Sequence, residues 1–155
     1  MTKNTQHVAF LQHKNELLKE AQTAREFADS YRNYKVGAAA LAWNSKTKEY
    51  SIYRGCNLKP VNPGEKMCAE RIAVGAAKSY GSSKVVALAI VGEPQDTTTL
   101  TLHPCISCLE FLSTVKGCDE DTIVLTEWNG VEEVHTIKKL LHLHRNGIKT
   151  VCTIS

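Results

Sequence analysis

Two short stretches of the sequence place three cysteines where helices are expected to begin. The first, MCAERIAVGAAKSY at residues 67–80, has a cysteine two positions before a glutamate and then an apolar run. The second, HPCISCLEFL at residues 103–112, has a C-x-x-C pair directly after a proline, a residue that favours the first turn of a helix. Thiolates at helix starts are stabilised by free backbone N–H groups and by the helix dipole, which suits them to bind a cation. The candidate ligands are therefore Cys68, Cys105 and Cys108.

These cysteines and Glu70 form a donor set typical of a catalytic zinc site. Cysteines three positions apart at a helix start point to the same side, and a second helix start nearby would bring Cys68 to them. Three protein ligands leave the fourth position of a tetrahedral zinc open for water, as a catalytic site requires. Glu70 follows Cys68 too closely to join the same tetrahedron easily, but its carboxylate can hydrogen-bond that water and pass a proton to a leaving group.

Other uses of the cysteines stay open on the residues alone. A structural zinc knuckle needs a fourth ligand, for which His103 is the nearest candidate and Cys56 the next. A thioredoxin-like redox pair needs only the C-x-x-C cysteines. The order C-x-E and then P-C-x-x-C, each opening a helix, resembles the signature of zinc deaminases, and this resemblance favours catalysis over both alternatives.

Composition narrows the class of protein. The 155 residues are 43% hydrophobic with a formal net charge of +3, which predicts one folded domain over residues 1–155. Because no block of Lys or Arg stands out, we expect no nucleic-acid partner. The N-terminus lacks the apolar stretch of a signal peptide and no apolar run is long enough to span a bilayer. We therefore expect a cytoplasmic protein with no membrane partner.

The cysteine count fits the same compartment. Six cysteines without a secretory signal are expected to be reduced thiols rather than a disulfide framework. The three that stand apart from the others are predicted to be small core hydrophobes: Cys56, Cys118 and Cys152.

The rest of the chain alternates between helical and strand patterns. Apolar residues at three- and four-residue spacing predict a helix over about residues 7–29, and a shorter helix is predicted at 137–143. Strands are predicted at 36–42, 50–54, 85–91 and 122–126, the first two joined by a turn at 44–48 and the third fully buried at the centre of the sheet. The small residues after Gly37 indicate a strand that another backbone or a ligand approaches closely. Alternating helices and buried strands predict the α/β class with a mixed sheet.

Over about residues 31–144 the sequence resembles the cytidine deaminase family in its small, three-cysteine form. The resemblance rests on five motifs: Tyr34 before VGAAA, GCNLK at 55–59, CAER at 68–71, PCISCL at 104–109 and TIVLTEWNGVEEVHTIKKLL at 122–141. It implies a three-layer α/β/α fold around a mixed sheet of about five strands.

The resemblance also implies a role for each site residue. Zinc would be bound by Cys68, Cys105 and Cys108, with Glu70 as the catalytic acid–base. Arg71 would donate hydrogen bonds to cysteine sulfur and so offset the negative charge of three thiolates. The residues implied to contact or line the substrate site are Tyr34, Asn57, Lys59, Ala69 and Pro104.

Two positions depart from the family pattern. Lys59 stands where the family has a glutamate that helps to bind the ribose hydroxyls, and Leu109 stands where it has a second arginine. A lysine can donate hydrogen bonds but cannot accept them. Either Lys59 favours an anionic or acceptor-rich group on the substrate, or it turns out to solvent and Asn57 alone holds the sugar. The departures leave the metal chemistry intact and put the substrate preference in question.

The implied activity is zinc-dependent hydrolytic deamination of an aminopyrimidine nucleoside such as cytidine or deoxycytidine, or of a related amino-heterocycle, with release of ammonia, as in pyrimidine salvage. The alternatives are deamination of a nucleoside antibiotic or of a modified or phosphorylated substrate, and a non-catalytic protein with a structural zinc. Family members of this length are typically tetramers with shared active sites. The resemblance therefore implies a small-molecule substrate and a homotetramer, with a dimer as the second choice.

Overall fold

A five-stranded mixed sheet forms the centre of the fold in the computed structural model, which describes residues 1–95 and 98–146. The strand order is β3-β2-β5-β6-β7, and the strands are β2 (Val36–Asn44), β3 (Glu49–Cys56), β5 (Lys84–Gly92), β6 (Ile123–Trp128) and β7 (Val131–Thr136). Strands β5 and β6 pair in parallel, and the other neighbours pair antiparallel. The predicted class and the predicted sheet are confirmed.

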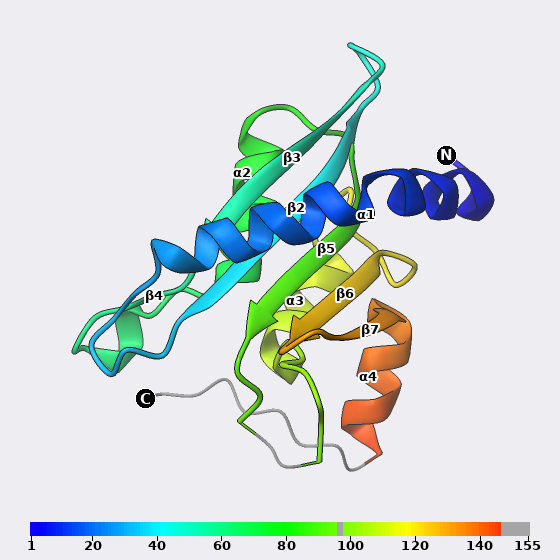
Figure 1. The fold of residues 1–155 in the computed structure, drawn as a ribbon. Helices are drawn as coiled ribbons and strands as arrows, with labels where there is room; N and C mark the ends of the chain where they lie inside the picture. Colours follow the sequence, from blue (N-terminus) through cyan, green and yellow to red (C-terminus); the bar gives the residue numbers. More distant parts are fainter. Residues whose placement is uncertain (96–97, 147–155) are drawn as a thin grey trace.

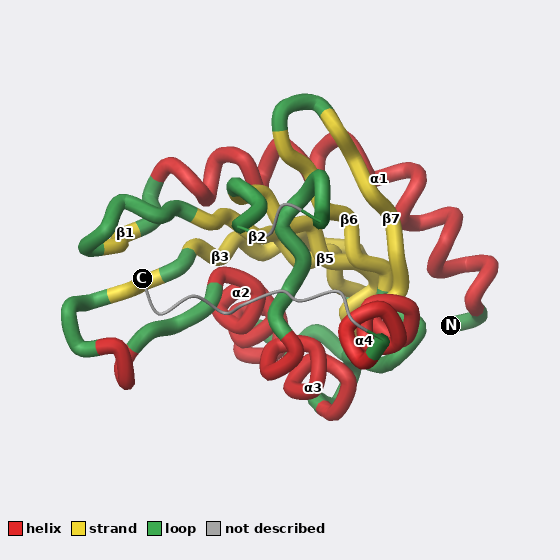
Figure 2. Tube along the Cα trace, turned by 90° about the horizontal axis from the view of Figure 1, so that it is seen from below, coloured by secondary structure: helices red, strands yellow, loops and turns green. Residues whose placement is uncertain are grey.

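Helices cover both faces of this sheet. Figure 1 shows α1 (Lys3–Glu26) crossing one face, and Figure 2 shows α2 (Ala69–Ser79), α3 (Ile106–Thr114) and α4 (Ile137–Arg145) together on the other. Alternate residues of β2 point to opposite faces, so Ala39 and Leu41 pack in the core beneath α1, whereas Ala38 and Ala40 pack in the core beneath the other three helices. The expected three-layer α/β/α arrangement is therefore confirmed.

Two glycines let helices lie directly on the sheet. A Cβ atom at Gly37 in β2 would lie 2.5 Å from the backbone nitrogen of Arg25 in α1. A Cβ atom at Gly55 in β3 would lie 2.5 Å from the backbone nitrogen of Ala73 in α2, on the opposite face. Close approach at the start of β2 was predicted, and the approaching backbone is that of α1.

Three predictions of local structure are wrong in part. The first helix ends at Glu26 rather than near residue 29, because Asp29–Ser30 forms β1 and pairs in parallel with β4 (Leu58–Lys59). The segment 57–66, for which no helix or strand was predicted, contains β4 and a short 3-10 helix, η1 (Pro63–Glu65). Strand β7 was not predicted, because it is an antiparallel edge strand whose side chains are exposed or half-buried.

The elements that carry the sequence motifs meet on one face of the sheet. Cys68 is the N-cap residue of α2 and Cys105 is the N-cap residue of α3, so both helices begin where the cysteines predicted. Cys118 is buried in the core, as predicted, while Cys56 is half-buried and Cys152 lies outside the described residues. No helix among the described residues is both long and apolar enough to cross a membrane.

Candidate active site

The starts of α2 and α3 bring cysteine sulfurs and a carboxylate together. The ligand atoms of Cys68, Glu70 and Cys108 all lie within 4.8 Å of one another, Cys108 being one turn inside α3 and fully buried. Cys105 is buried at the start of the same helix, outside this most closely spaced group. The structure thus gathers sulfurs from two helix N-termini, where free N–H groups favour thiolates.

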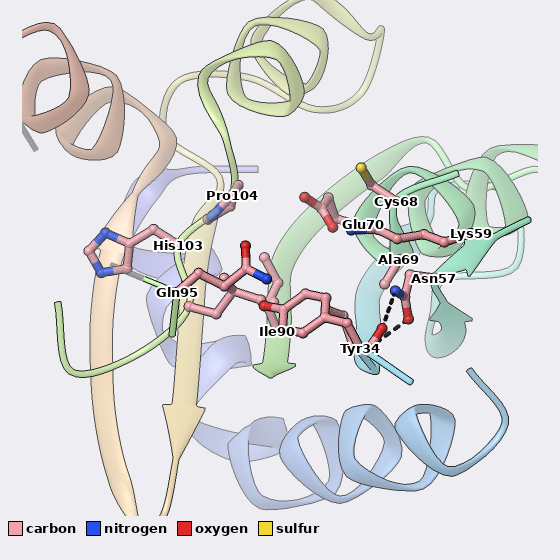
Figure 3. A pocket seen from close by; sticks show the side chains of 12 residues that line it. Tyr34, Asn57, Lys59, Cys68, Ala69, Glu70, Ile90, Gln95, His103 and Pro104 are labelled. Carbon is pink, nitrogen blue, oxygen red and sulfur yellow. Dashed lines mark hydrogen bonds between the residues drawn. The ribbon is translucent and has the colours of Figure 1, made fainter. Parts of the chain in front are cut away.

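Glu70 lies in the first turn of α2 and is 6% exposed. In Figure 3 its carboxylate projects into a pocket beside the Cys68 side chain. A carboxylate so placed beside two sulfurs is within reach of any cation held by them and of any group bound to that cation.

Arg71, the next residue of α2, binds the other helix. Its Nε donates a hydrogen bond to Sγ of Cys108 over 3.4 Å, and its Nη2 donates to Oγ of Ser107 over 2.9 Å. The guanidinium carbon also lies 4.6 Å from the ring centroid of Phe111. Burial opposes the charge of Arg71, but the hydrogen bond to Cys108 and the charges of the three cysteines outweigh burial and raise its pKa.

Leu109 follows Cys108 and is buried in the core beneath α2, α3 and α4. The position where the resemblance implied a second arginine is therefore occupied by apolar packing rather than by a charge on the thiolates. Arg71 is thus the arginine for which a sulfur contact is established.

The five residues implied to contact substrate line a single pocket together with Cys68 and Glu70 (Figure 3): Tyr34, Asn57, Lys59, Ala69 and Pro104. Five further lining residues were not predicted as substrate contacts: Val36, Ile90, Gln95, Leu102 and His103. The two aliphatic strand residues come from the ends of β2 and β5, which sequence patterns identify as core rather than as pocket wall. The pocket therefore combines apolar walls with polar groups near Glu70.

Asn57 is fully buried, and its side chain is hydrogen-bonded to the backbone of two other residues of the pocket wall. Its Oδ1 accepts a hydrogen bond from the N–H of Val36, and its Nδ2 donates to the carbonyl oxygen of Tyr34, each over 2.8 Å. Its amide oxygen and one of its N–H groups are thus engaged by backbone. This arrangement fixes the entry to β2 and with it the position of Tyr34, whose hydroxyl donates to the carbonyl oxygen of Glu93 over 2.7 Å.

Lys59 is buried in the pocket wall, with 6% of its surface exposed. Its Nζ lies 5.0 Å from the ring centroid of Tyr34, and in Figure 3 its side chain extends along the pocket toward Glu70. The alternative in which Lys59 turns out to solvent is therefore wrong. Its parallel pairing in β4 with Ser30 holds the residue at the site.

Neither candidate for a fourth ligand of a structural zinc joins the cysteine group. His103 packs against β7, with its Nε2 3.4 Å from Oε1 of Glu133, and its ring points away from Glu70 in Figure 3. Burial lowers the pKa of His103 below its ordinary value, and Glu133 offsets this only in part. The Cys56 thiol instead lies 3.6 Å from the carbonyl oxygen of Phe27. None of the five cysteines of the described residues forms a disulfide.

This donor set suits zinc. Thiolates are preferred ligands of this ion, and an arginine that donates to a ligating sulfur is the kind of outer contact that metal sites use. Cys68, Cys105 and Cys108 would supply three ligands, while Glu70 stands beside them.

Comparison with known proteins agrees with this site. A family model described as the cytidine and deoxycytidylate deaminase zinc-binding region matches residues 11–124. The chain belongs to this family. It is 35% identical over 127 residues to a cytidine deaminase of Halalkalibacterium halodurans, covering 81% of this chain and 88% of the relative. A cytidine deaminase of Sporosarcina psychrophila is 33% identical over 127 residues, covering 81% and 85% of the two chains.

Solved structures of the family share the fold. The crystal structure of cytidine deaminase from Burkholderia pseudomallei superimposes with a TM-score of 0.68 at 29% identity, covering 81% of this chain and 94% of that one. The corresponding enzyme from Mycobacterium tuberculosis gives a TM-score of 0.62 at 29% identity over 82% and 92%. The chain is therefore a zinc-dependent, cytidine deaminase-like hydrolase.

Proposed function

We propose that this hydrolase deaminates an aminopyrimidine nucleoside or a related amino-heterocycle and releases ammonia. The observation that carries the proposal is the position of Glu70, whose buried carboxylate lies within 4.8 Å of the sulfurs of Cys68 and Cys108 in a pocket with apolar walls. Apolar walls suit the faces of a planar base, and the Glu70 carboxylate lies beside the sulfurs that would hold the metal.

In this proposal the chain's own residues handle protons. Cys68, Cys105 and Cys108 would hold zinc, which would activate water by lowering its pKa toward neutrality. Glu70 accepts a proton from that water and donates it to the ring nitrogen while the water oxygen bonds to the ring carbon that bears the amine. Glu70 then takes the remaining proton of the added hydroxyl group and passes it to the amine nitrogen as the carbon–nitrogen bond breaks, so that one carboxylate serves as base and acid in turn. Arg71 keeps Cys108 in place through its hydrogen bond.

Lys59 supports a narrower substrate class. A buried ammonium at the substrate wall presents donors and a positive charge, which match phosphate or carboxylate oxygens better than ribose hydroxyls. We therefore infer a preference for a nucleoside-type substrate that carries an anionic or acceptor-rich group. A phosphorylated nucleoside or a nucleoside antibiotic with a carboxylate satisfies this description.

A screen for ammonia release tests both the proposed deamination and the inferred preference for an anionic or acceptor-rich substrate. The zinc-loaded protein is assayed on cytidine, deoxycytidine, cytosine, cytidine monophosphate and blasticidin S. The expected result is turnover of at least one substrate, with the best substrate bearing an anionic or acceptor-rich group. Glu70→Gln should lower kcat by about 10² to 10⁴ or more while zinc is retained.

The control for Glu70→Gln is Glu110→Gln, which neutralises an exposed carboxylate on α3 and should leave turnover unchanged. If Glu70→Gln were as active as the wild type on the best substrate, Glu70 would not be the acid–base. If a protein with bound zinc released ammonia from none of the substrates, these substrates would be excluded.

We also infer that the chain assembles as a homo-oligomer, with a tetramer as the expected state. Large apolar side chains are exposed near the C-terminal end of α1 and around the β4 segment, where a neighbouring copy would cover them: Phe27, Tyr31, Leu58, Val61 and Met67. Light scattering coupled to size exclusion gives the mass directly. Replacing Phe27 and Val61 by Asp should yield a smaller species, and a monomeric wild type would exclude the assembly.

A further inference from the structure

A second cluster of metal-ligating side chains lies between β7 and the segment that precedes α3. It consists of His103, Glu133 and His135, whose ligand atoms all lie within 4.8 Å of one another. The Nε2 of His103 is 3.4 Å from Oε1 of Glu133, and the Nε2 of His135 is 3.2 Å from Oε2 of the same carboxylate. No cysteine belongs to this cluster, so its donor chemistry differs from that of the site described above.

The fold brings these three side chains together from two directions. Glu133 and His135 are two residues apart in β7, so their side chains leave the same face of the strand. His103 reaches them from the segment before α3, and its side chain is 2% exposed. The hydroxyl of Thr101 donates a hydrogen bond to Glu133 and thereby orients the carboxylate between the two imidazoles.

The geometry matches that of a cation site. Ligands about 2.0–2.2 Å from a tetrahedral zinc are about 3.3 Å from each other, close to the two nitrogen–oxygen distances found here. Two imidazoles and one carboxylate are the ligand set of many zinc sites, and an outer hydrogen bond to the carboxylate is the usual support for such a ligand.

A second observation concerns the other ring nitrogen of His103. Nδ1 is buried and has no hydrogen-bond partner among the described residues. The hydrogen bonds within the cluster leave this atom unsatisfied, and a buried polar atom without a partner calls for a water or an ion. The ring of His144 in α4 lies 6.2 Å from that of His103, so a further imidazole stands next to the cluster.

We propose that His103, Glu133 and His135 bind a divalent transition-metal cation such as zinc or cobalt, at a site separate from that of the cysteines. A cation here fixes β7 to the segment that ends in Pro104 and Cys105. The bound cation thus holds the segment that leads into α3 against β7. The proposal needs no assumption about the substrate or about turnover.

Cobalt titration of the full-length protein carrying one zinc per chain, held by the cysteines, tests the site. Cobalt bound by imidazole and carboxylate absorbs in the visible range and lacks the thiolate-to-cobalt charge-transfer band that cysteine ligation gives. The expected result is a saturable visible absorption at about one added equivalent without the charge-transfer band. His135→Asn and Glu133→Gln should each weaken this binding at least about tenfold.

Glu133→Gln removes a charged ligand but keeps an oxygen that can accept the hydrogen bond from Thr101. Weaker cobalt binding in this variant therefore reports the loss of the ligand and not the loss of that hydrogen bond. The control is His142→Asn, which removes an exposed histidine of α4 and should bind cobalt as the wild type does. No saturable absorption in the wild type, a charge-transfer band alone, or unchanged binding in both variants would each overturn the proposal.

A measurement on the wild type keeps the test valid if a variant fails to fold. Added zinc should shift the imidazole nitrogen signals of His103 and His135 in the NMR spectrum and leave those of His142 in place. Shifts confined to other histidines would exclude the site. Deaminase activity is measured separately, so a failure of this proposal and a failure of the proposed function are distinguishable.

Discussion

The guanidinium of Arg71 joins the two helices of the site, since its Nε donates to the sulfur of Cys108 over 3.4 Å while Arg71 itself belongs to α2. Three thiolates on a zinc ion leave a net negative charge, and a donor aimed at one sulfur lowers that charge locally. Leu109 is buried in the core, so the position after Cys108 contributes packing rather than a second such donor. Replacing Arg71 should therefore lower the metal affinity more than replacing one of two such arginines would.

Arg71→Gln is expected to weaken zinc binding by about 10- to 100-fold, because outer hydrogen bonds to a ligand typically contribute that much. Competition with a chromophoric chelator measures the affinity. Arg71→Lys keeps the charge without the planar donor set, so its zinc affinity should lie between those of the wild type and Arg71→Gln. Arg32→Gln, which changes an exposed arginine, is the matched control. Equal zinc affinity in Arg71→Gln and wild type would show that the sulfur hydrogen bond is dispensable.

Two buried cysteines should differ sharply on replacement. Cys108→Ala removes a proposed ligand and should lose the zinc of the cysteine site, whereas Cys118→Ala removes a core thiol and should keep that zinc. Zinc content by mass spectrometry after dialysis against a weak chelator decides between them. A zinc content of Cys108→Ala equal to that of the wild type would exclude this sulfur as a ligand.

The features that follow from local patterns were predictable. The helix starts at Cys68 and Cys105, the buried central strand β5 and the close approach at Gly37 all depend on residues adjacent in sequence. Strand β7 was missed because an exposed edge strand shows little hydrophobic alternation.

What depends on distant partners could not be predicted. Lys59 is buried because β4 pairs with β1, two strands of two residues each that carry no sequence signal of their own. His103 was considered as a ligand for the cysteine zinc, but the pairing of β6 with β7 brings Glu133 and His135 to its ring instead. Both outcomes are set by sheet register, which the local sequence does not reveal.

Gly37→Ala is expected to destabilise the fold by about 2 kcal/mol or more, because the added methyl group would overlap the backbone of α1. Urea unfolding followed by circular dichroism measures the free energy. Gly75→Ala is the matched control: a Cβ there meets no atom within 4 Å, so the helix should gain about 0.5–1 kcal/mol. Equal effects of the two substitutions would contradict the close approach of α1 to β2.

Cys118 should make the protein less stable at alkaline pH. Burial raises the pKa of its thiol from 9.0 to about 11, so between these values the folded chain holds a proton that the unfolded chain has released. The free energy of unfolding therefore falls as pH rises through this range, and the contribution is fully present below it. When the pH rises from about 8 to about 10.5, the free energy of unfolding should fall by about 2 kcal/mol less in Cys118→Ala than in the wild type. Parallel losses in the two proteins would show that this thiol is not responsible.

Lys59→Glu should change which substrate is preferred. A buried lysine cannot accept hydrogen bonds from sugar hydroxyls, and each unpaired polar group costs about 1–3 kcal/mol. We expect weak activity of the wild type on cytidine and a gain in kcat/KM of about tenfold in Lys59→Glu. The same substitution should lower kcat/KM for an anionic substrate such as cytidine monophosphate, because the new carboxylate repels the phosphate that the ammonium attracts. Lys46→Glu, in the turn between β2 and β3, changes the net charge equally and should alter neither value. Efficient deamination of cytidine by the wild type, with no gain from Lys59→Glu, would show that Lys59 does not set substrate choice.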